Sequence, residues 1–341
     1  MRITVISNLY ALEHASRHGV ELRFIPHPRG EAGPLARARA FWQALWCDYA
    51  LINCSPRDLF ELCLLKLVVP FSRCKVVSLD TVLPVPRVTG QRQRLTLWLK
   101  KVLFRQAHLF IEYFKETDGY ERHYGIPRAK FRYVPFKINR YDKVLQTPTR
   151  DDGYIFCGGN TRRDFKTLIE AARGLSCPIK IVTMREAVIS EHGSTVDERN
   201  LPPHVEVIRH DGSDSFLDYI AAARLVVLPI RKENISASGI GVYLASMALG
   251  KCVVISEGPA VNGVVPEKAA VIVPAEDPAA LRAAIKRVLA DDRYRESVAA
   301  AGRRYALSLA GEERLCESVL DVLLTDRAAR VGRYQPLQKS T

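Results

Sequence analysis

Short apolar runs alternate with amphipathic segments along most of the chain. The runs, bounded by polar or glycine-bearing turns, predict buried strands, and apolar residues spaced three and four apart predict the helices between them. Strands are predicted at residues 3–7, 21–25, 49–53, 75–79, 107–112, within 127–135, and at 154–157, 179–183, 205–209, 225–228, 253–255 and 270–273. Apolar strands that alternate with helices indicate parallel sheets covered on both faces, which is an α/β fold.

The alternation restarts after a polar stretch, so two domains are predicted. A chain of 341 residues also exceeds what one hydrophobic core usually fills. The segment after Pro135 is the predicted linker, which gives a first domain at 1–145, a second at 151–325 and a polar, disordered tail at 326–341. Helices are predicted at residues 34–46, 56–68, 92–105, 164–174, 278–289 and 311–324. In the first of these helices the apolar residues at helical spacing are Leu35, Ala38, Phe41, Trp42 and Leu45.

Residues 225–256 have the pattern of a parallel β-α-β crossover, with Gly250 at the end of the helix. Ligands of such folds bind at the carboxyl ends of the strands, which places the loop at 231–241 over a pocket. The small and polar residues of this loop are Glu233, Asn234, Ser236, Ser238, Gly239 and Gly241. Either the helix N-terminus and its glycines receive a phosphate or sugar oxygen, or the serines serve only to cap the helix.

Several segments of the second half together resemble one enzyme family. They are Tyr154-Ile-Phe-Cys-Gly-Gly with Lys166-Thr-Leu-Ile-Glu-Ala-Ala, then Val226-Val-Leu-Pro, and Leu244-Ala-Ser-Met-Ala-Leu-Gly-Lys-Cys-Val-Val-Ile-Ser. In order and spacing, residues 153–322 resemble the nucleotide-sugar-binding domain of GT-B glycosyltransferases of the family 4 type. The resemblance implies two Rossmann-like domains that face a cleft, with a donor site in the second domain and an acceptor site in the first.

The resemblance also implies an activity. The chain is expected to move a sugar from a UDP- or GDP-linked donor to a lipid-linked or saccharide acceptor, in polysaccharide or glycolipid synthesis, with no bound cofactor or metal. The implied donor-binding residues are Gly158, Gly159, Asn160, Arg162, Arg163, Ser236, Ser238, Gly239 and Ile240. Arg163 matches the family's usual lysine and Arg162 adjoins it. Guanidinium groups suit diphosphate oxygens, and a solvated helix start is the alternative interpretation.

Two signature positions depart from the family pattern. Its Glu-x7-Glu motif falls on Ala237 and Ala245. Glu233 is therefore the candidate to supply a missing carboxylate, and retaining and inverting mechanisms both stay open. The departure also supports a different class of function, a catalytically silent GT-B-like protein that binds a partner or a sugar nucleotide.

The first half holds the candidates for the acceptor side. Asn8, Ser55 and Asp80 follow predicted strands, so they are expected on the cleft side of the sheet. An inverting reaction needs a general base there to deprotonate the acceptor hydroxyl. Asp80 is the candidate for that base, and a helix-capping role is the alternative.

The excess positive charge lies in the first half. Residues 1–150 hold 25 lysines and arginines against 12 acidic residues, whereas residues 151–341 hold 25 of each. The helix at 92–105 has an apolar side among basic residues, which indicates either a helix on an anionic membrane surface or a core-facing helix with a basic solvated side. Its apolar residues are Leu95, Trp98, Leu99, Val102 and Leu103, and its basic residues include Arg92, Arg94, Lys100, Lys101 and Arg105.

Composition narrows the location and the partners. The eight scattered cysteines are typical of a reduced compartment, and no apolar run is long enough to span a bilayer. We therefore expect a cytoplasmic protein, peripheral at the inner face of the membrane. No groove-reading helix or RNA-binding aromatic signature accompanies the charge, so nucleic acid is not an expected partner.

Overall fold

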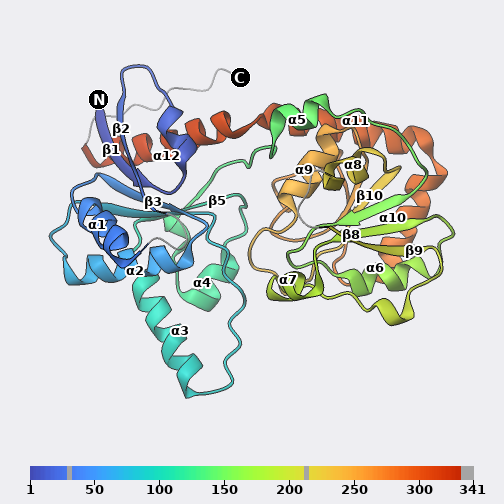
Figure 1. The fold of residues 1–341 in the computed structure, drawn as a ribbon, viewed down its shortest axis with the longest axis horizontal. Coiled ribbons are helices and arrows are strands. Elements are labelled where there is room, and N and C mark those ends of the chain that lie inside the picture. The colour runs from blue at the N-terminus through green and yellow to red at the C-terminus, as the bar shows by residue number, and fades with distance from the viewer. Residues whose placement is uncertain (29–32, 211–214, 332–341) are drawn as a thin grey trace. The chain divides into compact units, whose positions relative to one another are not determined.

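Figure 1 shows the computed structural model, which describes residues 1–28, 33–210 and 215–331. The chain forms two compact units. Unit 1 contains Met1–Tyr113, Thr117–Pro135 and Glu312–Thr341, and unit 2 contains Phe114–Glu116 and Phe136–Gly311. Within the described residues each unit holds a six-stranded parallel sheet flanked by helices, which confirms the predicted α/β class with two Rossmann-like units.

The strands of unit 1 run parallel in the order β2-β1-β3-β4-β5-β6. They are β1 Arg2–Ser7, β2 Glu21–Pro26, β3 Tyr49–Asn53, β4 Lys75–Leu79, β5 Leu109–Glu112 and β6 Phe131–Tyr133. From β2 onward each connection steps across the sheet in one direction, so right-handed crossovers put the helices of these connections on one face. These helices are α1 Pro34–Ala44, α2 Pro56–Val68, α3 Gln91–Phe104 and α4 Asp118–Tyr124, and the short η2 Arg128–Lys130 precedes β6.

The last helix, α12 (Glu312–Val331), packs on unit 1 beside the short helix η1 (Tyr10–His14). The Tyr49 hydroxyl lies 3.0 Å from the Leu323 carbonyl oxygen and donates to Asp326 Oδ2 (2.6 Å), and His108 Nε2 lies 2.8 Å from Asp326 Oδ1. These contacts hold the polar end of the helix on the sheet. The prediction of a disordered tail from residue 326 is therefore wrong as far as Val331, and residues 332–341 lie outside the described part of the chain. The predicted second domain ended at 325, whereas the contacts group α12 with unit 1.

The strands of unit 2 run parallel in the order β12-β11-β10-β7-β8-β9. They are β7 Ile155–Gly158, β8 Ile179–Thr183, β9 Val205–Arg209, β10 Leu225–Leu228, β11 Val253–Ser256 and β12 Val271–Val273. The chain starts in the middle at β7, builds outward to β9, and returns to β10 on the other side of β7. The boundary between β7 and β10 is thus a topological switch point, where doubly wound sheets bind their ligands.

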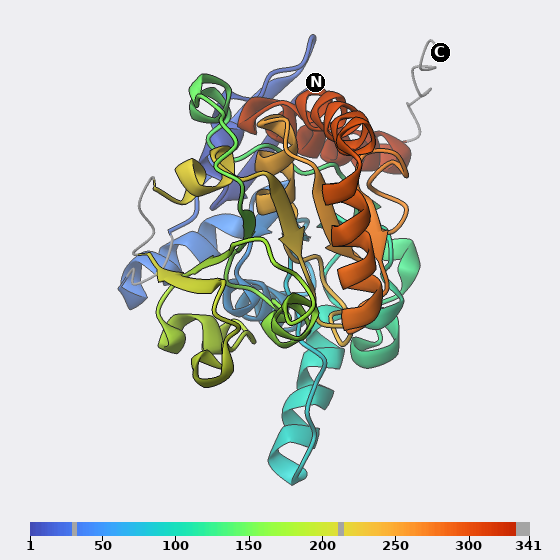
Figure 2. The ribbon, with the colours of Figure 1, turned by 90° about the vertical axis from the view of Figure 1, so that its right-hand side faces the viewer.

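Helices cover both faces of the unit 2 sheet. α6 Phe165–Ala172 packs with α10 Pro278–Ala290, and α9 Ile240–Ala248 packs with α11 Asp292–Leu309. Figure 2 looks onto this unit, with α10 and α11 in orange. The core beneath α6 and α10 includes Phe165, Leu168, Leu281, Ile285 and Val288. The remaining helices of unit 2 are α5 Tyr141–Gln146, α7 Glu186–Glu191, η3 Glu198–Asn200 and α8 Ser215–Ala221.

Helix α1 turns a different face to unit 1 from the one that its apolar spacing predicts. The exposed residues among those at this spacing are Leu35, Ala38 and Trp42. Instead, Ala40 and Ala44 are buried. Arg37, which shares their side of the helix, pairs with Asp58 and Glu61 of α2 at 2.6 Å each. The ion pairs and the small alanines orient the helix, so the buried face is not the one with the large apolar residues.

Helix α3 projects from unit 1 (Figures 1 and 2), and its last turn enters the core. Leu103 and Phe104 are buried, whereas Leu95 and Trp98 are 59% and 58% exposed. The alternative of a core-facing helix is therefore wrong, because most of its apolar side has no core to face. No helix among the described residues is both long and apolar enough to cross a membrane.

Candidate functional site

A cavity of about 400 Å³ lies at the switch point of unit 2. The loops after β7 and β10 meet there, because the Asp164 N–H donates to the Pro229 carbonyl (3.0 Å) and the Arg231 N–H to the Arg162 carbonyl (3.1 Å). The cavity wall is formed by Asn139, Arg140, Val144, Gly159, Asn160, Thr161, Arg163, His210, Phe216, Leu217, Ile220, Gly239, Gly241, Val242 and Ala245. A concave, largely apolar site of this size with a few polar groups suits a small-molecule ligand.

Arg163 is buried in this wall, with 2% of its surface exposed. Its Nε donates to the Gly158 carbonyl (2.8 Å) and its Nη1 to the Thr161 carbonyl (2.9 Å). In the described part of the chain no carboxylate forms an ion pair with this guanidinium, and burial lowers its pKa to about 10. The group stays charged at neutral pH. It is therefore a fixed cation without a counter-charge, an arrangement that favours an anionic ligand.

Two glycines make the space that the Arg163 guanidinium occupies. Gly159 has a φ of +102°, and a Cβ at this position would lie 2.5 Å from Arg163 Nη2. Gly239, with a φ of +89°, would bring a Cβ within 3.3 Å of Arg163 Nη1. The sequence predicts that Gly239 and Gly241 let a ligand approach the backbone. In the structure Gly239, together with Gly159, makes room for the arginine.

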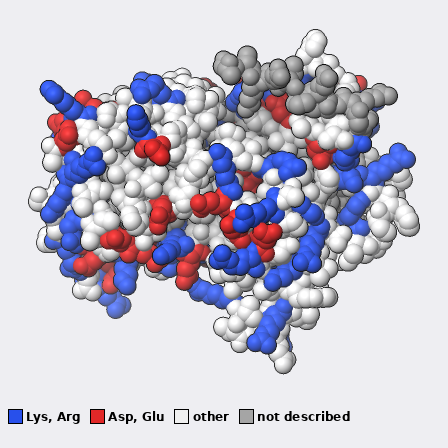
Figure 3. Space-filling model, turned by 180° about the vertical axis from the view of Figure 1, so that it is seen from behind, with Lys and Arg blue, Asp and Glu red and all other residues white. Residues whose placement is uncertain are grey.

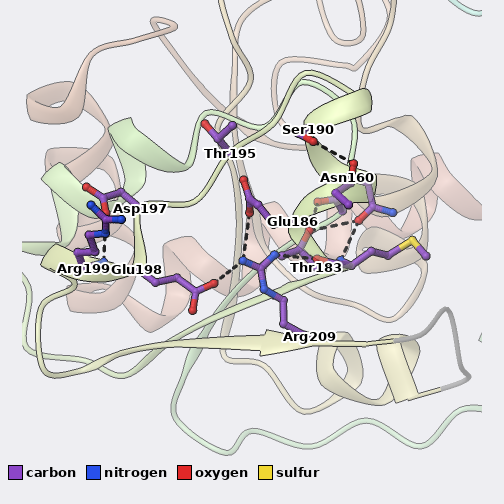
Figure 4. Close-up of polar contacts among 12 residues, drawn as sticks. Asn160, Thr183, Glu186, Ser190, Thr195, Asp197, Glu198, Arg199 and Arg209 are labelled. Carbon is purple, nitrogen blue, oxygen red and sulfur yellow. Dashed lines mark hydrogen bonds and ion pairs between the residues drawn. The ribbon is translucent and has the colours of Figure 1, made fainter.

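Asn160 is the second polar residue fixed in the wall. Its Oδ1 accepts hydrogen bonds from Thr183 Oγ1 and from the Met184 N–H, both at 3.2 Å (Figure 4). Its carbonyl accepts from Ser194 Oγ (2.6 Å), which also accepts from the Arg163 N–H (2.8 Å). With the amide oxygen engaged, the amide nitrogen is the group that remains to donate to a ligand.

A second arginine near this site is neutralised. Arg209, at the end of β9, pairs with Glu186 (3.2 Å) and with Glu198, and donates to the Met184 carbonyl (2.7 Å). Figure 4 shows both ion pairs as dashed lines. Arg209 therefore joins β9 to α7 and η3, while the charge of Arg163 has no such partner among the described residues.

Of the predicted donor-binding residues, those in the wall are Gly159, Asn160, Arg163 and Gly239. Ser236 and Ser238 lie outside it and are buried. The Ser236 hydroxyl donates to Asn234 Oδ1 (3.2 Å), and Asn234 Nδ2 donates to the Ser238 hydroxyl (2.8 Å). Both serines thus shape the loop after β10, and a direct contact with the donor stays a prediction.

The other predicted residues outside the wall are Gly158, Arg162, Ile240 and Glu233. The Gly158 carbonyl positions Arg163, and Ile240 is the buried first residue of α9. Arg162 has a left-handed φ of 55°, and its side chain lies against Gly193. Glu233 is exposed in the loop. Their direct roles in binding or catalysis stay predictions.

Sequence reasoning missed five polar or aromatic wall residues: Asn139, Arg140, Thr161, His210 and Phe216. Asn139 and Arg140 precede α5, in the stretch predicted as a linker. A Cβ at Gly241 would lie 2.9 Å from Asn139 Nδ2, so this glycine lets the amide approach α9. His210 directly follows β9, and the rule that strand ends hold ligands could have found it.

The carboxyl ends of β4 and β5 in unit 1 carry two carboxyl groups. Asp80 follows β4, has a left-handed φ of 52°, and accepts from the Cys54 thiol at Oδ2 (3.1 Å). Glu112 ends β5 and is fully buried. Its Oε1 accepts from the Thr81 N–H (3.2 Å), and its Oε2 has no hydrogen-bond partner among the described residues. Burial raises the pKa of Asp80, and burial together with the nearby Asp80 charge raises that of Glu112 well above its usual range.

The two other acceptor-side candidates have structural contacts. Asn8 joins β1 to β3, because its Oδ1 accepts from the Asn53 N–H (2.7 Å) and its Nδ2 donates to the Asn53 carbonyl (2.9 Å). Ser55 is the N-cap of α2 and hydrogen-bonds to Asp58. Asp80 caps no helix, because no helix begins between residues 81 and 90, so its capping alternative is wrong. Over the described ranges no three His, Cys, Asp or Glu side chains are grouped to hold a metal ion.

The architecture and the cavity together define a class of protein. Two Rossmann-like units, one with a ligand-sized cavity and a buried cation at its switch point, are the parts of a GT-B glycosyltransferase. Residues 153–291 match the family model described as Glycosyl transferases group 1. This match confirms the resemblance seen in the sequence.

Solved structures share the fold over nearly the whole chain. Sucrose-phosphate synthase from Thermosynechococcus elongatus is 16% identical with a TM-score of 0.63, covering 96% of this chain and 100% of that one. Anabaena HepE in complex with UDP is 13% identical with a TM-score of 0.63, and the match covers 96% of this chain and 100% of HepE. A glycosyltransferase from Rickettsia africae is 10% identical with a TM-score of 0.62, and the match covers 95% of this chain and 98% of that one. At these identities the likeness shows the fold alone, and no curated protein matches the chain.

Proposed function

We propose that this protein is a glycosyltransferase that uses a nucleotide-sugar donor. The observation that carries the proposal is Arg163, a buried cation with no carboxylate partner in the described ranges, at the switch point of a Rossmann-like sheet. A nucleoside diphosphate supplies the anion that such a site favours. HepE, which has the same fold, was solved in complex with UDP, and this supports a UDP- or GDP-linked donor.

The cavity residues have distinct proposed roles toward the donor. Arg163 neutralises the diphosphate and the Asn160 amide nitrogen donates to a donor oxygen. The N–H groups at the start of α9, beside Gly239 and Gly241, add the positive end of a helix. When the bond from the anomeric carbon to the diphosphate breaks, the electron pair leaves with the diphosphate, and Arg163 stabilises that charge. The proposed reaction is a metal-independent hexosyl transfer.

The proposed acceptor is a hydroxyl of a lipid-linked or saccharide substrate in polysaccharide or glycolipid synthesis. Asp80 takes the hydroxyl proton as the acceptor oxygen bonds to the anomeric carbon, in an inverting displacement. Burial raises the pKa of Asp80 toward the operating pH, which makes it a stronger base than an ordinary aspartate. Asn8 and Ser55, at neighbouring strand ends, complete the proposed acceptor side.

We also propose that the protein works in the cytoplasm, at the inner face of the membrane. Helix α3 projects from unit 1 and carries Arg92, Arg94, Lys100 and Lys101 with no acidic residue. Anionic lipid attracts such a helix by about 1 kcal/mol per basic residue near the surface. A lipid-linked acceptor would be met at that surface.

Calorimetric titration with UDP and GDP tests the donor site. A hydrogen bond to a charged group contributes about 1.5–3 kcal/mol, so we expect Arg163→Met to weaken binding of the preferred nucleotide at least tenfold. Arg209→Met is the matched control, because it removes a nearby arginine whose charge is already paired with Glu186 and Glu198. Its affinity should stay close to that of the wild type. Equal weakening by both variants, or folded wild type that binds neither nucleotide, would overturn the proposal.

A catalytically silent nucleotide-sugar-binding protein is the second candidate. The observation in its favour is Ala245, which lies in the cavity wall where the family pattern has a glutamate. Glu233, the proposed substitute, is exposed in the loop after β10. Release of free UDP or GDP from a panel of donors, in the presence of lipid-linked and saccharide acceptors, separates the candidates. Turnover that falls in Glu233→Ala supports the enzyme, and binding without turnover across the panel supports the silent protein.

A further inference from the structure

All three tryptophans of the chain lie exposed on unit 1. Trp42 is 65% exposed, Trp46 is 77% exposed and Trp98 is 58% exposed. Tryptophan carries a large apolar ring and is on average highly buried in globular proteins. Exposure of the complete set on one unit therefore indicates a surface that meets an apolar partner.

Exposed apolar side chains on three successive helical segments accompany the tryptophans. Helices α1, α2 and α3 follow one another on the same face of the unit 1 sheet, and α2 packs against α3 (Figure 1). The rings of Trp42 and Trp46 are in edge contact, with centroids 6.5 Å apart. Ser72 Oγ donates to the Leu45 carbonyl (3.1 Å), which holds the segment after α2 beside the end of α1. We call Trp42, Trp46, Val68, Phe71, Leu95 and Trp98 the aromatic surface.

The exposure of this surface is greatest where α1 and α2 end. Phe71 is 92% exposed and Val68 is 70% exposed, next to Trp46 at 77%. Each fully buried side chain of this size contributes about 1.5–3 kcal/mol relative to leaving it exposed. No such burial occurs within the described chain, so the aromatic surface is free to bury these side chains against something else.

Positive charge accompanies the aromatic surface. Residues 62–111 hold nine lysines and arginines and one acidic residue, Asp80. The nearest acidic side chains of α2, Asp58 and Glu61, are turned to Arg37 and paired with it. In Figure 3 the projecting end of α3, at the bottom of the view, is coloured blue and white. The partner of this surface is therefore both apolar and negatively charged.

We propose that the aromatic surface inserts into the interfacial layer of an anionic lipid bilayer. Tryptophan favours this layer because its ring is apolar and its N–H is polar, and the surrounding lysines and arginines meet anionic headgroups. A second copy of the chain fits less well. A symmetric pair would bring the same basic helices face to face, and like charges oppose that contact.

The proposal goes beyond the proposed function, in which charge alone holds α3 at the membrane. Attraction by charge is strongly screened at about 1 M salt, where the Debye length is ~3 Å. Burial of apolar side chains is not weakened in this way. Insertion also predicts contact by Trp42, Trp46 and Phe71, which lie outside α3. The donor cavity of unit 2 takes no part in it.

Tryptophan fluorescence tests insertion directly, because all of the emission comes from the aromatic surface. Full-length protein is mixed with vesicles of phosphatidylcholine and phosphatidylglycerol, with part of the phosphatidylcholine brominated in its acyl chains. We expect a blue shift of the emission and quenching by the brominated lipid, both persisting at about 1 M salt. Vesicle binding in sedimentation without shift or quenching would overturn insertion. A shift without vesicles that grows with protein concentration would identify a second copy as the partner.

A matched pair of variants separates this surface from a general effect of charge. Phe71→Glu keeps all three tryptophans and is expected to reduce vesicle partition at high salt by about tenfold or more. Leu145→Glu makes the same change in charge at a 47% exposed residue of unit 2 and is expected to leave partition close to the wild type. Equal weakening by both variants contradicts the proposal. Phe71→Glu should still bind nucleotide as the wild type does, so failure of insertion and failure of the donor site give different results.

Discussion

The two sheets carry ionisable groups of opposite kinds at their carboxyl ends. In unit 2 this edge holds Arg163, whose pKa is lowered to about 10, and in unit 1 it holds Asp80 and Glu112, whose pKa values are raised. Burial is the largest cause in all three groups, because it disfavours the charged form of each. Each unit therefore holds buried ionisable groups of a single charge type at the edge where parallel sheets bind ligands. Few opposite charges lie beside these groups.

The difference fits the proposed reaction, in which the two units bind different substrates. A departing diphosphate needs a cation, whereas an acceptor hydroxyl needs a base that can take its proton. Arg209 shows that unit 2 also pairs cations in the ordinary way, since two glutamates neutralise it near the same cavity. Among the described residues Arg163 has no counter-charge, and this, rather than the presence of an arginine, is what supports the proposed donor site.

The largest effect is expected at Asp80. If it takes the acceptor proton, Asp80→Asn should lower kcat/KM by about 10²–10⁴-fold, because a positioned general base contributes about that much. The Kd for UDP should not change, since the donor cavity lies in unit 2. Steady-state kinetics with calorimetry on the same preparation measure both quantities. A variant with wild-type kcat/KM would remove Asp80 from the mechanism.

Cys54→Ala sharpens the assignment of Asp80 by changing its pKa alone. The Cys54 thiol donates to Asp80 Oδ2 (3.1 Å) and thereby favours the carboxylate. Removal of this bond should raise the pKa of Asp80 further. The acidic limb of the kcat/KM profile should then move to higher pH, with the plateau nearly unchanged. A limb that does not move would mean that another group sets it.

The next-largest effect is expected at Gly159, the glycine that makes room for the Arg163 guanidinium. Gly159→Ala would place a Cβ 2.5 Å from Arg163 Nη2 and force the guanidinium to move, so nucleotide affinity should fall about tenfold or more. Gly153→Ala is the control, because Gly153 also has a positive φ, +77°, but no atom within 4 Å of the added Cβ. Both variants should lose about 1–2 kcal/mol of stability from the left-handed backbone. Equal nucleotide affinity in the two variants would contradict the role of Gly159.

Glu112→Gln should change the pH dependence of stability. The folded state holds the Glu112 proton to a higher pH than the unfolded chain, so the stabilisation from this proton is complete below about pH 4.3. It then falls by about 1.4 kcal/mol per pH unit until the pH reaches the raised pKa of the folded state. Glutamine does not ionise and can still accept from the Thr81 N–H. The stability of the variant relative to wild type should therefore rise between about pH 5 and about pH 7, as chemical denaturation at each pH measures. Parallel curves of unfolding free energy against pH for the variant and the wild type would mean that the pKa of Glu112 is not raised.

The sequence predicted the sheets well because their inner strands are buried on both faces. Strands β3 and β10 have the predicted bounds, since each is a nearly continuous apolar run. Arg163 and its glycines were also found, because strand ends and the family resemblance point to the same loop. These features depend on patterns within short stretches of the chain, so a single sequence is enough to predict them.

Features that depend on distant residues were not predictable in this way. The face of α1 is set by the pairing of Arg37 with two residues of α2, which no periodicity within α1 records. The end of α12 is held by Tyr49 and His108, more than two hundred residues earlier in the chain. Asn139 reaches the cavity from a segment without periodicity. In each case a polar contact across the fold decides the structure.

The smallest effect concerns Ser55, which has both a structural contact and a predicted acceptor role. Loss of an N-cap costs about 1 kcal/mol, so Ser55→Ala should destabilise the protein by that amount. Asp164→Ala removes the corresponding cap of α6 in unit 2, where Asp164 accepts from the Thr167 N–H (3.1 Å), and should cost a similar amount. Denaturant unfolding measures both variants. Because the two caps are alike, a rise in the acceptor KM that appears in Ser55→Ala and not in Asp164→Ala cannot come from lost stability, and it would assign Ser55 to the acceptor. An unchanged KM in both would leave Ser55 with its cap alone.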